Sequence, residues 1–131
     1  MVLIFTKEVE EVMRILIVDD VAPIAEEAAR FLRESLSGNN EVLKAFSGAE
    51  AIKILEPNPA DIVVTDQTMP GMNGDGLTAW IKGRSKTAVV LWSSNNAPLG
   101  HKADLFLYKG DTDSLLRFIE KMQKLKKNGA T

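Results

Sequence analysis

Short apolar runs that alternate with helical patterns are the feature that most limits how this chain can fold. Continuous apolar runs occupy residues 15–18, 62–65, 88–92 and 105–108, and a half-polar run occupies 41–45. Uninterrupted runs of this length are typical of strands buried on both faces of a parallel sheet, whereas a half-polar strand suits a sheet edge. Since crossovers between parallel strands are right-handed, we predict one α/β domain with a doubly wound, five-stranded parallel sheet in the order 2-1-3-4-5.

Helical patterns lie between most of these runs. Pro23 suits the first turn of a helix that reaches Leu36, and Ser47 can cap a short helix that ends before Pro57. A third helix is expected to end at Gly83, and a last helix is expected over 112–127 with Thr112 as its cap. The stretch 95–102 shows no helical stripe, so the helix expected there is short, distorted or missing.

The chain has 131 residues, which suits one domain. We predict an amino-terminal extension over 1–12, the folded domain over 13–127 and a carboxyl-terminal tail over 128–131. The apolar run 2–5 is too short for a secretory segment or a membrane span, and a net charge of −2 provides no basic field for nucleic acid or an anionic membrane. The sequence has no cysteine, which excludes disulfides and thiol chemistry and is compatible with a reducing cytosol. Together with the short apolar run, this leads us to expect a cytoplasmic protein.

Four of the predicted core strands end in polar residues. Asp19 and Asp20 follow the first strand, Asp66 the third, Ser93 the fourth and Lys109 the fifth. The carboxyl ends of parallel strands meet at one edge of a sheet, which is where ligands bind in open α/β folds. We therefore expect these side chains to converge.

Three converging carboxylates repel one another unless a cation lies between them. Mg²⁺ prefers oxygen ligands and needs only one or two carboxylates beside a phosphate oxygen. Lys109 and Ser93 are suited to phosphoryl oxygens, so the group as a whole indicates phosphoryl transfer onto Asp66. A structural reading stays open for each residue: Asp19 and Asp20 can cap the next helix, Asp66 and Ser93 can form turns, and Lys109 can be a solvated strand end.

Other chemistry has little support in the sequence. The spacing of Gly71, Gly74 and Gly76 matches neither a dinucleotide fingerprint nor a phosphate-binding loop. The single histidine, His101, is expected at the surface and excludes a histidine metal cluster within one chain. Trp80 and Trp92 fall on apolar stripes and are expected in the core.

The residues resemble the receiver domain of two-component response regulators. The resemblance rests on Val18-Asp19-Asp20, on Asp66-x-x-Met69-Pro70-Gly71-Met72-Asn73-Gly74, on a hydroxyl residue after the fourth strand and on a lysine after the fifth. It covers Met13 to about Lys126.

The resemblance implies a flavodoxin-like, CheY-like fold in which Asp66 accepts a phosphoryl group from a phosphohistidine of a sensor histidine kinase or phosphotransfer protein. It implies Mg²⁺, or Mn²⁺ in its place, held by Asp20, Asp66 and the backbone carbonyl of Thr68, with Asp19 acting largely through water. Ser93 and Lys109 would bind the phosphoryl group. The resemblance also implies that Phe106 and Ser93 act as switch residues. It implies that Thr68 and Asn95 tune the lifetime of the phosphoryl group.

Three features depart from the family's pattern. Gly110 stands where a proline is usual, so Lys109 can be aimed differently. The segment between Ser93 and Lys109 is shorter than in the chemotaxis-type member, which agrees with a lost helix. Asp75-Gly76 replaces an apolar-acidic pair, which predicts a looser start to the third helix.

The leading hypothesis is thus a phosphorylated switch that promotes its own phosphorylation and dephosphorylation without being a conventional enzyme. Its expected partners are the phosphodonor, a downstream protein of unknown identity and a second copy in a possible homodimer; neither nucleic acid nor membrane is expected. The alternatives are a receiver-like interaction module that signals without phosphorylation and, with less support, a metal-dependent phosphatase.

Overall fold

The computed structural model describes residues 12–129 of the chain. The predicted extension over 1–12 lies almost wholly outside the described residues. Five strands form one parallel sheet in the order β2-β1-β3-β4-β5, which confirms the predicted fold class and order. The strands are β1 (Met13–Val18), β2 (Asn40–Ala45), β3 (Ile62–Thr65), β4 (Ala88–Ser93) and β5 (Leu105–Tyr108).

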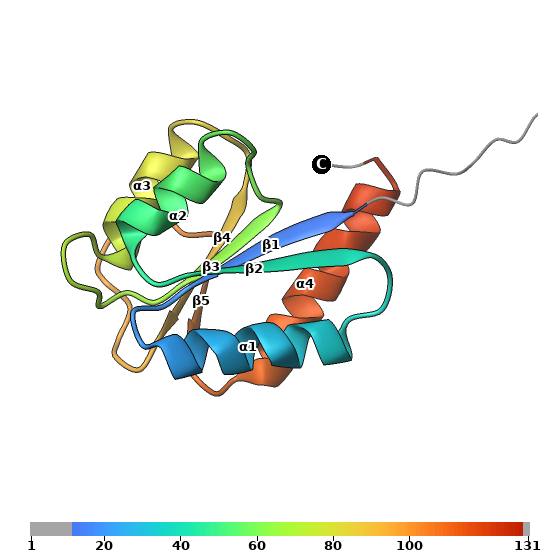
Figure 1. Cartoon of the computed structure of the whole chain (residues 1–131), viewed down its shortest axis with the longest axis horizontal. Helices are drawn as coiled ribbons and strands as arrows, with labels where there is room; N and C mark the ends of the chain where they lie inside the picture. The colour runs from blue at the N-terminus through green and yellow to red at the C-terminus, as the bar shows by residue number, and fades with distance from the viewer. Residues whose placement is uncertain (1–11, 130–131) are drawn as a thin grey trace, which may run out of the picture.

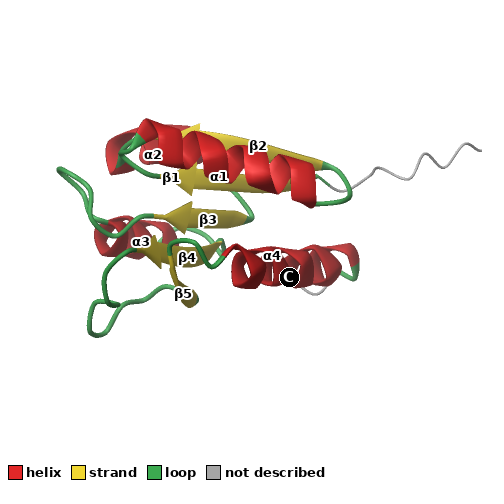
Figure 2. Ribbon diagram, turned by 90° about the horizontal axis from the view of Figure 1, so that it is seen from below, coloured by secondary structure: helices red, strands yellow, loops and turns green. Residues whose placement is uncertain are grey.

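Two layers of helices cover the sheet (Figures 1 and 2). On one face α1 (Ala22–Ser35) and α4 (Thr112–Lys127) pack onto the alternate side chains of the strands, with Leu32 and Ile119 fully buried. On the other face α2 (Gly48–Leu55) and α3 (Gly74–Lys82) bury Leu77 and Ile81. The central strands are therefore covered on both faces, as their continuous apolar sequences predict.

The helix ends follow local hydrogen bonding. Ser47 caps α2 by accepting the N–H of Glu50, as predicted. The prediction for Thr112 is wrong: Asp111 is the cap of α4 and accepts the N–H of Ser114 at 3.2 Å. Both side chains can cap a helix, and the turn at Gly110, where φ is +97°, places the carboxylate rather than the hydroxyl at the helix end.

The connection between β4 and β5 contains no helix. Residues 94–104 cross from one strand to the next as bends and a single turn at 99–100, as the broken pattern predicts. Asp104 anchors the end of this connection, because its Oδ2 accepts the N–H of Val89 at 2.7 Å and pairs with Lys82 Nζ at 2.5 Å. Leu99 at the turn is fully exposed.

Two predictions about aromatic residues need correction. Trp92 is buried as predicted, but Trp80 is only half-buried and lies under the guanidinium of Arg84, 4.6 Å from its ring centroid. His101 is not a surface residue: it is half-buried against Phe106, with a ring-centroid separation of 6.4 Å. In the part of the chain that the structure describes, no helix is long and apolar enough to cross a membrane.

Candidate functional site

The turn after β1 supplies the first two acidic side chains of the site. Asp19 is buried, and its Oδ1 accepts the N–H of Val21 at 2.9 Å, whereas Asp20 is exposed. The residue at the cap position of α1 is Val21, which has no side-chain capping bond. Asp19 and Asp20 therefore do not cap this helix.

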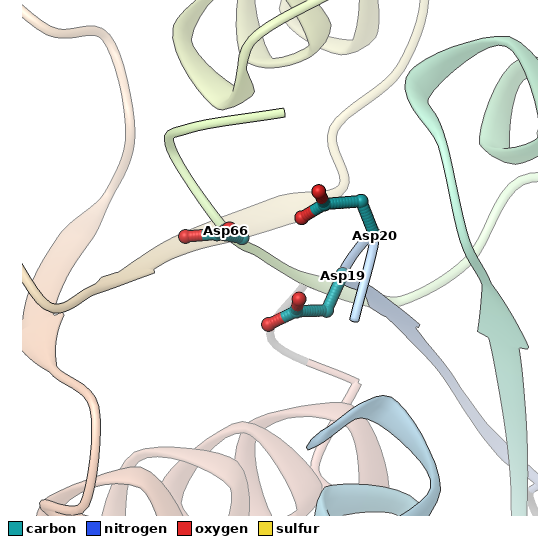
Figure 3. Close-up of side chains that lie close together, drawn as sticks. All are labelled: Asp19, Asp20 and Asp66. Carbon is teal, nitrogen blue, oxygen red and sulfur yellow. The ribbon is translucent and has the colours of Figure 1, made fainter. Parts of the chain in front are cut away.

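Asp66 follows β3 and lies beside the Asp19-Asp20 turn. β1 and β3 are neighbours in register, with Val18 opposite Thr65, so the residues that follow them come together. Each of Asp19, Asp20 and Asp66 offers a carboxylate oxygen, and these oxygens all lie within 4.8 Å of one another. Figure 3 shows the three side chains grouped at the strand ends. Asp66 is only 7% exposed.

Lys109 reaches into the acidic group from the end of β5. Its Nζ lies 2.7 Å from Asp19 Oδ2 and 3.3 Å from Asp66 Oδ1. The replacement of the usual proline by Gly110 thus leaves Lys109 aimed at the carboxylates. The φ of +97° at Gly110 explains the residue type, because a proline ring fixes φ near −65°.

Burial and neighbouring charges together shift the pKa values of Asp66 and Lys109. Burial raises the pKa of Asp66, the positive charge of Lys109 opposes that rise, and the negative charge of Asp19 adds to it; the net shift is upward. For Lys109, burial alone would lower the pKa, but the hydrogen bond to Asp19 and the charges of Asp19 and Asp66 outweigh it and raise the pKa. The pair is thus a charged lysine beside a carboxylate that burial makes easier to protonate.

Ser93 and the residues near it lie at the same edge but are engaged locally. Ser93 is buried at the end of β4, and its Oγ accepts the N–H of Asn95 at 3.1 Å. Ser93 therefore forms a turn, which is the structural alternative for this residue. Thr68 and Asn95 are both exposed, and the backbone of Thr68 slightly opposes the rise in the pKa of Asp66.

Phe106 lies next to the site in the sheet, opposite Leu91 of β4. Its half-buried ring makes an edge-on contact with Tyr108, with centroids 5.1 Å apart. Tyr108 donates its hydroxyl to Asn96 Oδ1 at 3.0 Å and so ties β5 to the start of the helix-free connection. This bond gave no signal in the sequence, because a tyrosine at a strand end has many possible partners.

The loop after Asp66 depends on two contacts, at Gly74 and Gln67, that the sequence did not reveal. A side chain at Gly74 would collide with the backbone carbonyl of Asp66, so only glycine allows α3 to start this close to β3. Gln67 accepts a hydrogen bond from the N–H of Asp75 through Oε1, at 2.8 Å. Neither contact follows from periodicity, because both depend on how the loop returns to its own start.

Fold and site together define a doubly wound α/β domain with an acidic group and a lysine at the carboxyl edge of its sheet. A profile of the response regulator receiver domain matches residues 15–123. The chain therefore belongs to this family, and it is a CheY-like receiver domain of the two-component response regulator type.

Curated relatives agree with the family. The chain is 40% identical over 65 residues to chemotaxis protein CheY-3 of Vibrio cholerae serotype O1, a match that covers 50% of this chain and 48% of that protein. It is 33% identical over 77 residues to the sensor histidine kinase TmoS of Ectopseudomonas mendocina, covering 59% of this chain and 8% of TmoS. The chain thus spans less than half the length of both relatives.

Solved structures of receiver domains superpose on most of the chain. A response regulator receiver domain protein from Clostridium thermocellum has a TM-score of 0.75 and 30% identity, and the match covers 87% of this chain and 96% of that one. The response regulator TrrA of Thermotoga maritima, solved in complex with Mg²⁺-BeF, has a TM-score of 0.74 and 28% identity, with coverage of 83% and 97%.

Proposed function

We propose that Asp66 accepts a phosphoryl group and that the modified domain then binds a downstream protein. The observation that carries the proposal is the contact of Lys109 with a buried carboxylate, Asp66, that also lies beside Asp19 and Asp20. A structural ion pair would need one acid and one base. The further carboxylates of Asp19 and Asp20 at the same point favour a bound cation, beside which Lys109 can pair with an anion.

The residues of the site fit Mg²⁺ or Mn²⁺. The available donors are carboxylate oxygens within 4.8 Å of one another, which is the hard-oxygen ligand type these ions prefer. Asp20, Asp66 and the backbone carbonyl of Thr68 would hold the ion, and Asp19 would act through water. A bound ion supplies charge that neutralises the oxygens of an incoming phosphoryl group.

In the proposed reaction, an ionised carboxylate oxygen of Asp66 forms a bond to phosphorus while the bond from phosphorus to a histidine nitrogen of the donor breaks. The electron pair stays on the imidazole ring, which takes a proton from solvent. Lys109 pairs with a phosphoryl oxygen, and the Ser93 hydroxyl donates to another. A sensor histidine kinase or a phosphotransfer protein is the expected donor, and Thr68 and Asn95, which flank the site, would tune how fast water removes the group.

Phosphorylation would act as a switch because it changes charge at one edge of the fold. The added negative charge draws Ser93 and Lys109 inward and changes the strand ends that carry Phe106 and the 94–104 connection. We assign this activity to the folded region 13–127, with 1–12 as an extension and 128–131 as a tail, and expect a cytoplasmic protein, with a homodimer as one possible assembly.

The proposal is tested by incubating the protein with MgCl₂ and beryllofluoride, or with a small phosphodonor. We expect one adduct per chain on the wild type, detected by intact mass for the phosphodonor and by ¹⁹F NMR for beryllofluoride, and none on Asp66→Asn. A folded wild-type protein that takes up neither reagent contradicts the proposal. Full downstream binding by unphosphorylated Asp66→Ala would instead support the module that signals without phosphate.

A further inference from the structure

Gln67, at the start of the loop that carries Asp66, ties this loop to the helix that follows it. Gln67 contacts the first turn of α3 twice: its backbone carbonyl accepts the N–H of Gly74 at 2.8 Å, and its Oε1 accepts the N–H of Asp75, also at 2.8 Å. Asn73 accepts the next N–H, that of Gly76, at 2.7 Å.

This pattern accounts for the first three N–H groups of α3. The first N–H groups of a helix have no partner within the helix and must find one elsewhere. The predicted looser start at Asp75-Gly76 is therefore wrong, because Gln67 satisfies two of these groups and Asn73 the third.

In the chain, Gln67 lies between Asp66, the proposed phosphoryl acceptor, and Thr68, whose backbone carbonyl is assigned to the metal ion. It directly follows Asp66 and directly precedes Thr68, so both bonds to α3 fix the backbone at the point where Asp66 and Thr68 must present their oxygens together. Met69, next in the chain, is buried against the α2–α3 face and holds the other side of this segment.

We infer that Gln67 is a positioning residue for phosphoryl transfer: its side-chain bond to the N–H of Asp75 holds the 66–68 backbone in the arrangement that binds the metal ion. Groups that orient metal ligands change metal affinity by about 10- to 100-fold when removed. The inference rests on the proposed function for its role in transfer, but the positioning itself is measurable without any phosphodonor.

Three variants separate positioning from helix capping. Gln67→Met keeps the length of the side chain and removes the acceptor, whereas Gln67→Glu keeps an acceptor oxygen for the N–H of Asp75. Asn73→Ala is the matched control, because it removes one capping bond from the same turn of α3 without touching residues 66–68.

The experiment combines three readouts. Amide hydrogen exchange on the metal-free protein should show faster exchange at Asp75 in Gln67→Met. Mg²⁺ titration followed by Trp fluorescence should show about tenfold weaker binding in Gln67→Met, and less than about threefold weakening in Asn73→Ala and Gln67→Glu. Beryllofluoride uptake at saturating Mg²⁺ should recover in Gln67→Met.

The outcomes distinguish this inference from the proposed function. If Gln67→Met binds Mg²⁺ as tightly as the wild type, or no more weakly than Asn73→Ala, Gln67 is only a helix cap and the inference fails while the proposed function stands. If the wild type binds Mg²⁺ but takes up no phosphoryl group or beryllofluoride, the proposed function fails, and the Mg²⁺ titrations still decide whether Gln67 positions the loop.

Discussion

The loop 66–74 and the connection 94–104 both begin at the carboxyl end of a central strand, yet they are built in opposite ways. The 66–74 loop is held by contacts at both ends: Gln67 binds the start of α3, and Gly74 lies against the carbonyl of Asp66. The 94–104 connection is held near its start by the bonds from Asn95 to Ser93 and from Tyr108 to Asn96, and at its end by the bond from Val89 to Asp104. Between these points Leu99 is fully exposed.

The difference agrees with the proposed function, in which the 66–74 loop carries the phosphoryl acceptor and the 94–104 connection responds to phosphorylation. In the proposed function Asp66 is a phosphoryl acceptor, which has to be positioned to within a fraction of an ångström, and its loop is closed by hydrogen bonds and close packing as that role requires. The 94–104 connection, which we propose changes on phosphorylation, carries no such demand, and surface connections tolerate changes in length. Substitutions in the acidic edge should therefore cost more than matched substitutions in the connection.

The largest effect is expected for Lys109→Met. It leaves the buried carboxylates of Asp19 and Asp66 without their counterion, and removing one partner of a buried ion pair typically costs about 3 kcal/mol of unfolding free energy. The matched control is Lys82→Met, which removes the half-exposed pair with Asp104 at the end of the connection and should cost under about 1 kcal/mol. Urea denaturation measures both, and equal losses would contradict the comparison.

A second large effect is expected for Gly74→Ala. The added Cβ would meet the carbonyl of Asp66 and lie 2.9 Å from Leu91 Cδ2, and backbone cannot move aside as a flexible side chain can. We expect a loss of about 2 kcal/mol, as for other overpacked positions. Gly76→Ala, two residues along the same helix, meets nothing closer than 3.3 Å and should be neutral or slightly stabilising in the same thermal unfolding assay.

Asp104→Ala tests the anchor at the carboxyl end of the connection. It leaves the N–H of Val89, a fully buried residue, without its acceptor, for which a cost of about 1 to 2 kcal/mol is expected. Asp104→Asn keeps an acceptor oxygen and should lose less. A cost as large as that of Lys109→Met, again from urea denaturation, would show that the connection is as constrained as the acidic edge.

The sequence predicted the sheet order and the convergence of Asp19, Asp66 and Lys109, because both follow from rules about parallel sheets. Continuous apolar runs mark buried strands, and the polar residue after each run has to lie at the common edge. Asp19, Asp66 and Lys109 directly follow these apolar runs. A small error in a predicted strand boundary therefore does not move them away from the common edge.

The sequence could not predict contacts that depend on the path of a loop. Three such contacts are the bond from the N–H of Asp75 to Gln67, the bond from the Tyr108 hydroxyl to Asn96 and the helix cap at Asp111. Each requires one particular backbone geometry among several that the same residues allow. His101 was misplaced for the same reason, because its burial depends on how the helix-free connection folds over Phe106.

A smaller effect, with a pH dependence, is expected for Asp66→Asn. Since the folded pKa of Asp66 is raised above its unfolded value, the folded state holds this proton more tightly, and wild-type stability is lost as pH rises through the raised pKa. Asparagine does not titrate, so the variant should be more stable than the wild type at neutral pH, by about 1 kcal/mol as for other stabilising substitutions. The gain should vanish on acidification.

Stability measured over a pH series checks the sign of this effect. Lys109 keeps its 2.7 Å contact with Asp19 in the variant, so the loss of one carboxylate does not strand the lysine. A gain of equal size at acid and neutral pH would mean that charge burial is not its cause.

The smallest effect is expected for Leu99→Ser. The side chain is fully exposed at the turn of the connection, so its removal should change the unfolding free energy by less than about 0.5 kcal/mol. Leu99 is positioned by a backbone turn, with Gly100 at a φ of +68° and the N–H of His101 on the carbonyl of Pro98 at 3.4 Å, rather than by packing of its side chain. A loss above 1 kcal/mol in urea denaturation would mean that the connection packs against the domain more firmly than its contacts indicate, and the contrast with the 66–74 loop would then disappear.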